Sequence, residues 1–148
     1  MSLQKQLEKD YISALKAKDQ EKVAVLRMLK AALKNLQVQK RRDVTEQDVL
    51  DVLVKQAKQR QDSIVQFLAG GRQDLADVEA GELAVIKAYL PEQLEGEDLE
   101  AAVRDCIAEV GAKGPQDMGR VMKALLEKYS GRVDGKAASA MVRRQLLT

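Results

Sequence analysis

Apolar residues recur every three or four positions along almost the whole chain, and this spacing is the feature that most constrains the fold. Leu3, Leu7 and Leu15 begin the pattern, which is typical of an amphipathic helix. No run of β-branched and aromatic residues between turn residues predicts a strand. With three Tyr, one Phe and no Trp, the core must be aliphatic. Lys, Glu, Gln and Arg, which are good helix formers, fill the rest, so we predict an all-α fold.

The first half of the chain is predicted to form about four helices. Ser2, Asp19 and Thr45 are expected to cap the first three, and Asp48 completes a sequence like a capping box with Thr45. The second and third helices are long and polar, and we expect them to pair as a long hairpin. The expected helices cover residues 2–18, 20–40, 46–70 and 72–89.

Pro91 ends this half, and residues 91–98 are expected to be a linker between two domains, 1–90 and 99–148. Three short helices then follow, which should pack as a three-helix bundle. Two glycines, Gly81 and Gly119, fall inside predicted helices at a cost of about 1 kcal/mol relative to Ala. A close contact would explain each of them. The expected helices of the bundle cover residues 98–110, 116–129 and 136–147.

The net charge of +2 hides an uneven distribution along the chain. Residues 91–112 hold seven acids and one base, whereas residues 113–148 hold eight bases and three acids. Residues 21–60 hold ten bases and five acids. Basic clusters of this kind attract phosphate groups through charge and counterion release, but they also occur on ordinary solvated helix faces.

Acid–base catalysis by this chain would have to use carboxylates or lysines with shifted pKa values. Histidine is absent, which removes the side chain best suited to proton transfer near neutral pH. With one cysteine and no histidine, the usual structural zinc sites are excluded, and no metal site or cofactor is predicted. Cys106 follows the apolar side of a helix and is expected to be a buried thiol. We do not expect catalysis by this chain on its own.

The protein is predicted to be cytoplasmic and not to bind membranes. The first ten residues lack the apolar core of a signal peptide, and no apolar stretch reaches the ~18–20 residues of a membrane span. A single cysteine fits a reducing compartment.

Three ordered motifs in the second half resemble the GatB/YqeY family. They are LPEQL at 90–94, DMGRVM at 117–122 and GRVDGK at 131–136. In the first half, LRMLKAALKN at 26–35 and KQRQDS at 58–63 are similar to stand-alone YqeY-like members. Together these motifs extend over nearly the whole chain.

The resemblance implies an N-terminal helical domain followed by a domain similar to the tail of the B subunit of tRNA-dependent amidotransferases. That tail recognises tRNA and is not the catalytic centre, so tRNA is the expected partner, together with an aminoacylation or transamidation enzyme. The motif residues expected to shape turns are Pro91, Gly119, Gly131, Asp134 and Gly135. RNA contacts are predicted at Arg120, Lys123, Arg132, Lys136, Arg143 and Arg144, and also at Arg27, Lys30, Lys58 and Arg60.

Two other functions stay open. The long polar helices 20–40 and 46–70 are suited to a protein–protein adaptor, for which RNA would be irrelevant. A carbon–nitrogen ligase component that uses glutamine as nitrogen donor is a minor alternative implied by the family. The basic residues of the first half can extend an RNA surface or form ion pairs between domains, and the sequence does not separate these roles.

Overall fold

The apolar periodicity gives a helical protein, as predicted. The computed structural model describes residues 2–148, and within this range it has seven α-helices, one short 3-10 helix and no strand. The chain divides into two compact units, one ending at Leu90 and the other beginning at Pro91. That each unit folds as an independent domain stays a prediction.

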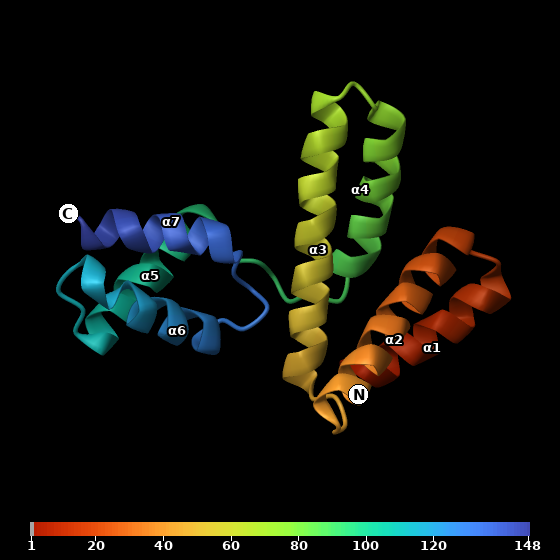
Figure 1. The fold of residues 1–148 in the computed structure, drawn as a ribbon, viewed down its shortest axis with the longest axis horizontal. Helices are drawn as coiled ribbons and strands as arrows, with labels where there is room; N and C mark the ends of the chain where they lie inside the picture. Colours follow the sequence, from red (N-terminus) through yellow and green to blue (C-terminus); the bar gives the residue numbers. More distant parts are fainter. Residues whose placement is uncertain (1) are drawn as a thin grey trace. The chain divides into compact units, whose positions relative to one another are not determined.

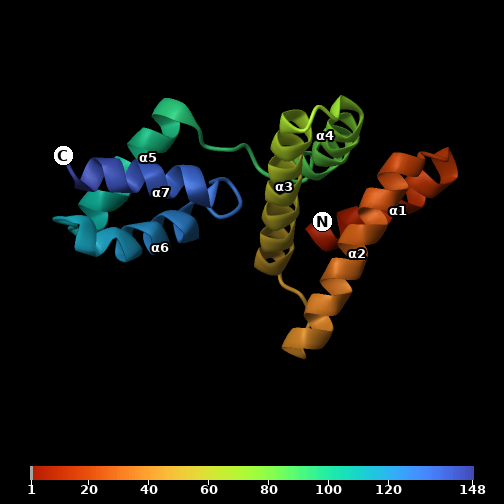
Figure 2. The same ribbon diagram turned by 45° about the horizontal axis from the view of Figure 1, so that its top comes forward.

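The first unit consists of two helical hairpins (Figures 1 and 2). Helix α1 lies beside α2, and α3 lies beside α4. The predicted long hairpin of the second and third helices is therefore wrong. Periodicity shows which face of a helix is apolar, but not which neighbour covers that face. The four helices are α1 (Leu3–Ala17), α2 (Gln20–Lys40), α3 (Glu46–Ala69) and α4 (Gln73–Lys87).

Side chains predicted as caps begin the first three helices. Ser2 accepts a hydrogen bond from the amide of Lys5, and Asp19 accepts one from the amide of Lys22, both at 3.2 Å. Thr45 and Asp48 form a full capping box, in which each side chain accepts from the other residue's amide. These bonds satisfy amides that have no partner inside their own helix.

Each unit has its own aliphatic core. In the first unit, Leu7, Leu26, Leu29, Leu53 and Ile86 are almost completely buried. Leu15, predicted for the buried stripe of the first helix, is instead 46% exposed. The buried residue at that end of α1 is Ala14, so the apolar pattern was assigned to the wrong face there.

The second unit is a three-helix bundle, as predicted. Val103, Cys106, Val121, Leu125 and Val142 are completely buried in its core, so the thiol is a buried one. The elements are α5 (Gly96–Val110), a 3-10 turn (Pro115–Asp117), α6 (Met118–Lys128) and α7 (Gly135–Leu146).

The segment predicted as a linker over residues 91–98 belongs largely to this bundle. Helix α5 begins at Gly96, so residues 96–98 are helical. The amide of Leu94 donates to the carbonyl of Arg132 at 2.7 Å, and the Gln93 side chain donates to the carbonyl of Gly131 at 2.6 Å. These contacts fix the segment to the turn between α6 and α7. Polar composition alone did not reveal them.

The two helical glycines differ in their surroundings. A Cβ at Gly81 on α4 would collide with the carboxylate of Glu21 on α2, so a close contact with a flexible side chain does lie at this glycine. At Gly119 a Cβ would meet nothing within 4 Å, so no contact among residues 2–148 explains it. None of the helices described between residues 2 and 148 is long and apolar enough to cross a membrane.

Candidate RNA-binding surface

Most acidic side chains of the bundle helices lie on α5, and most basic ones lie on α6 and α7. Helix α5 carries five acids and only Arg104 as a base. Helix α7 carries Lys136, Arg143 and Arg144 and no acid, and α6 carries three bases and one acid. The sequence-predicted contacts of this half therefore gather on α6, α7 and the turn between them.

Several of these cations have no acidic partner among the residues that the structure describes, 2–148. Lys123, Lys136 and Arg143 are exposed and form no hydrogen bond or ion pair with any residue in 2–148. Arg144 is exposed and contacts only the sulfur of Met141, at 3.0 Å, within the same range. Lys136 and Arg143 are seven positions apart and so lie on one face of α7, about 10 Å apart along its axis.

Arg120 is partly used by the fold itself. Its guanidinium pairs with Asp117 at 3.2 Å and donates to the carbonyl of Val110 at the end of α5. Asp117 also accepts from the amide of Lys113 at 3.0 Å, and this bond is the main reason why its pKa is lowered. Arg120 thus closes the α5–α6 turn, although its side chain is still 61% exposed.

Arg132 is held against the bundle. Its Nε donates to the carbonyl of Glu92 at 2.9 Å, and its guanidinium carbon lies 5.7 Å from the centroid of the Tyr129 ring. The residue is half-buried. Of the predicted phosphate contacts in this unit, Arg132 is therefore the one most committed to internal structure.

The motif residues lie at turns and helix ends. Asp134 caps α7 by accepting from the amide of Ala137 at 3.2 Å. Gly131 has a φ of +74°, a left-handed conformation that side chains rarely adopt. Gly135 is the first residue of α7, and Pro91 is the first residue of the second unit.

The basic residues predicted in the first unit are separated. Arg27 and Lys30 lie on α2 beside Tyr11 of α1, whereas Lys58 is exposed on α3. The structure therefore brings Arg27 and Lys30 together and leaves Lys58 on another helix.

Arg60 is held inside the first unit, and its contacts there do not favour the predicted role in RNA binding. Its side chain is only 11% exposed and pairs with Glu82 of α4 at 3.4 Å. It also donates to the side chain of Gln56 at 2.8 Å. Because the guanidinium is buried between α3 and α4, it is not available to a phosphate. Its ion pair lies within the first unit.

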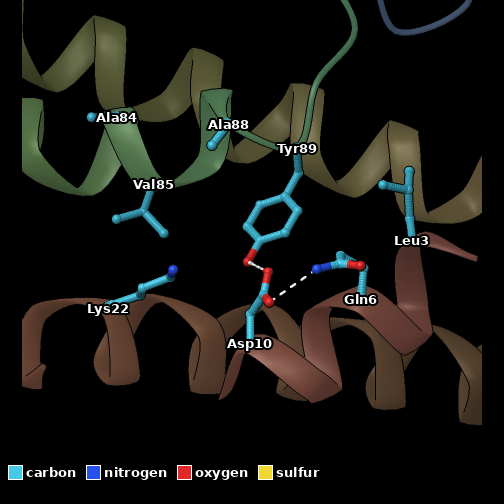
Figure 3. A pocket seen from close by; sticks show the side chains of 8 residues that line it. All are labelled: Leu3, Gln6, Asp10, Lys22, Ala84, Val85, Ala88 and Tyr89. Atoms are coloured by element: carbon cyan, nitrogen blue, oxygen red, sulfur yellow. Dashed lines mark hydrogen bonds between the residues drawn. The ribbon is translucent and has the colours of Figure 1, made fainter. Parts of the chain in front are cut away.

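The first unit also contains a cleft of about 590 Å³ between α1, α2 and α4 (Figure 3). Asp10 and Gln6 point from α1 and Lys22 points from α2 toward Tyr89 and Val85 on the opposite side. The remaining lining is apolar or small, from Leu3, Ala84 and Ala88.

A short hydrogen bond crosses this cleft. The hydroxyl of Tyr89 donates to Asp10 at 2.5 Å, and Gln6 donates to the same carboxylate at 3.0 Å. The bond from Tyr89 is the main cause of the lowered pKa of Asp10, whereas burial is the main cause of the raised pKa of Tyr89. Sequence reasoning missed this site, since the two residues are 79 positions apart.

Comparison with known proteins identifies fungal relatives. "Altered inheritance of mitochondria protein 41, mitochondrial" of Saccharomyces cerevisiae (strain YJM789) is 38% identical over 85 residues, which is 57% of this chain and 46% of that protein. The match thus spans about half the length of that relative. The protein of the same name from Lachancea thermotolerans is 28% identical over 145 residues, 95% of this chain and 77% of that protein.

These names contradict the predicted cytoplasmic location, because the relatives are named as mitochondrial proteins. The prediction used the missing apolar signal and the single cysteine. Both observations bear on secretion and on oxidising compartments, and neither distinguishes the cytosol from another reducing compartment.

The family resemblance found in the motifs is confirmed over nearly the full chain. The family profile described as "Yqey-like protein" matches residues 4–146, which includes both structural units. The chain belongs to the family of Yqey-like proteins.

Proposed function

We propose that this protein is a tRNA-binding accessory protein without catalysis of its own, which acts beside an aminoacylation or transamidation enzyme. The observation that carries the proposal is a group of cations on α6 and α7 that form no ion pair within residues 2–148, namely Lys123, Lys136, Arg143 and Arg144. Charges that the fold does not neutralise are free to replace the counterions of a phosphate backbone.

The mode of binding follows from the residue types. Tyr129 is the only aromatic residue of the second unit, so a series of stacked single-stranded bases is not supported there. Exposed Lys and Arg side chains on short helices suit contacts to the backbone of folded RNA, which is recognised largely by shape. Structured tRNA fits this chemistry better than a single strand does.

Binding of the full chain to total tRNA across a salt series tests the proposal. A variant with Lys123, Lys136, Arg143 and Arg144 changed to Gln should bind more weakly, with a salt slope reduced by up to about four. A control variant, which removes two charges from the same unit, changes Arg104 and Lys128 to Gln. These bases belong to the same unit but pair with Glu100 and Glu109, so their loss should have little effect. Absence of binding at low salt by the unaltered protein would overturn the proposal.

A second candidate, a protein–protein adaptor, is favoured by exposed apolar side chains on the other unit. Val65 and Leu68 on α3 are 67% and 49% exposed, and Val78 on α4 is 57% exposed. Changing Val65 and Leu68 to Ser should abolish a stoichiometric protein complex that survives nuclease treatment if this function is correct. Unchanged tRNA binding by the same variant would separate the two candidates.

A further inference from the structure

The first unit divides into a basic hairpin and an acidic hairpin. Residues 1–42, which form α1 and α2, contain eleven Lys and Arg against four Asp and Glu, a net charge of +7. Residues 43–90, which form α3 and α4, contain five bases against nine acids, a net charge of −4. The most basic part of the protein is thus the α1–α2 hairpin, because residues 113–148 reach only +5.

Three cations of this hairpin form a row on α2. Arg27, Lys30 and Lys34 are three and seven positions apart, so they share one side of the helix. Lys30 and Lys34 line a groove of about 350 Å³ between α1 and α2. Glu8 lines the same groove, but no member of the row forms an ion pair with a carboxylate in residues 2–148.

Tyr11 of α1 orients two members of the row. Its hydroxyl accepts bonds from Nε and Nη2 of Arg27, both at 3.3 Å. The Nζ of Lys30 lies 4.4 Å from the centre of the same ring, within the range of a cation–π contact. One neutral side chain therefore holds two positive charges together without neutralising either. Such preorganisation lowers the entropic cost of binding an anion.

We propose that the row Arg27–Lys30–Lys34, oriented by Tyr11, binds the phosphate backbone of RNA as a second surface on the first unit. The inference takes its ligand class from the proposed function and adds a surface that does not depend on α6 and α7. The row extends about 10 Å along α2, which is long enough to contact more than one phosphate of a strand. The groove beside it also offers the amide groups of Gln4 and Gln37, which suit polar phosphate and sugar contacts.

The test compares two variants with the same loss of charge in the full chain. Lys30 and Lys34 are changed to Gln in one, and the exposed Lys55 and Lys87 of the acidic hairpin are changed to Gln in the control. Binding of fluorescent total tRNA is followed by anisotropy from low to high salt, after circular dichroism has confirmed the helix content. We expect the first variant to lose about tenfold or more in affinity at low salt, and its salt slope to fall by about two. The control should remain close to the unaltered protein.

Tyr11 is a positioning residue, and its substitution gives a different result. Tyr11→Leu keeps every charge, so affinity should fall several-fold while the salt slope stays unchanged. Tyr11→Phe keeps the ring beneath Lys30 and loses only the acceptor for Arg27, so its effect should be smaller. Equal affinity of Tyr11→Leu and the unaltered protein would overturn the positioning role.

The outcomes separate this inference from the proposed function. Weaker binding in the α6–α7 variant alone would keep the proposed function and overturn the second surface. Weaker binding in the Lys30/Lys34 variant alone would support the second surface and remove α6 and α7 from the interface. If the unaltered protein ignores tRNA but binds vesicles rich in anionic lipid through the same lysines, the ligand is a membrane, and both RNA assignments fail.

Discussion

The hydroxyl of Tyr89, directly after α4, donates a hydrogen bond of 2.5 Å to the carboxylate of Asp10 on α1. This contact joins the two hairpins of the first unit, because α1 belongs to one and α4 to the other. Tyr89→Phe should lower the free energy of unfolding by about 1–2 kcal/mol, since a bond to an ionised group is lost at a half-buried site. Urea unfolding at pH 7 measures the change. Tyr129→Phe is the matched control, because its hydroxyl makes no hydrogen bond described in residues 2–148.

The same pair predicts how stability depends on pH. The bond from Tyr89 lowers the pKa of Asp10. The stability that the ionised Asp10 carboxylate contributes is therefore fully present above the ordinary pKa of about 3.9, and it is lost as the pH falls through the lowered pKa. The pKa of Tyr89 is raised. The stability that its neutral hydroxyl contributes is therefore present below the ordinary pKa of about 10 and is lost as the pH rises above that value. Tyr89→Phe should therefore lose less stability than the unaltered protein between pH 10 and 12. An equally steep loss in both proteins would contradict the assignment.

Asp48 should dominate the acid sensitivity of the α2–α3 junction. Its side chain is 5% exposed and accepts from Lys40 at 3.0 Å and from Arg42 at 2.6 Å. The bond from Arg42 is the main reason why the pKa of Asp48 lies far below its usual range. The stability that the ionised Asp48 carboxylate contributes is fully present above about pH 4 and declines as the pH falls below that value. Asp48→Asn should lower the thermal midpoint by several degrees at pH 7 and have a smaller effect at pH 3. Thermal scans at both pH values check this, with exposed Asp51→Asn as control.

Gly81→Ala should be neutral or stabilising by up to about 1 kcal/mol, despite the close contact. The atom that a new Cβ would meet is the carboxylate of Glu21, at the end of a flexible side chain that can rotate away. Alanine then gains its helix propensity over glycine within α4. Urea unfolding of Gly81→Ala, Glu21→Ala and the double variant isolates the collision. If Gly81→Ala is destabilising even when Glu21 has been changed to Ala, the collision with the Glu21 side chain is not the cause. Backbone packing would then require the glycine.

Local chemistry was readable from the sequence, whereas long-range pairing was not. Ser2 and Asp19 were predicted as caps because capping uses residues only three positions apart. The burial of Arg60 was not predicted, because it depends on Glu82 from a different helix. Asp10 and Tyr89 gave no signal at all, since their contact exists only after both hairpins have packed.

For the candidate RNA-binding surfaces as well, local charge could be read from the sequence, whereas the pairing of the helices could not. Charge counts from the sequence identified the basic last quarter of the chain, residues 113–148. The window 21–60, however, joined the end of a basic hairpin to the start of an acidic one. The boundary lies at the turn after Arg42, which becomes evident only when α2 and α3 are seen to belong to different hairpins. Lys34 was not among the predicted RNA contacts, although it lies one turn from Lys30 on α2.

Cys106 provides a direct measurement of whether the two units unfold separately. The thiol is completely buried in the core of the second unit, and burial is the main cause of its raised pKa. A thiol reagent should therefore react slowly with the native protein and at least about a hundredfold faster in denaturant. Because Tyr89→Phe acts on the first unit, it should leave this rate unchanged at low denaturant if the units open independently. An increase in the rate that parallels the loss of global stability would instead mean that the two units unfold as one cooperative structure.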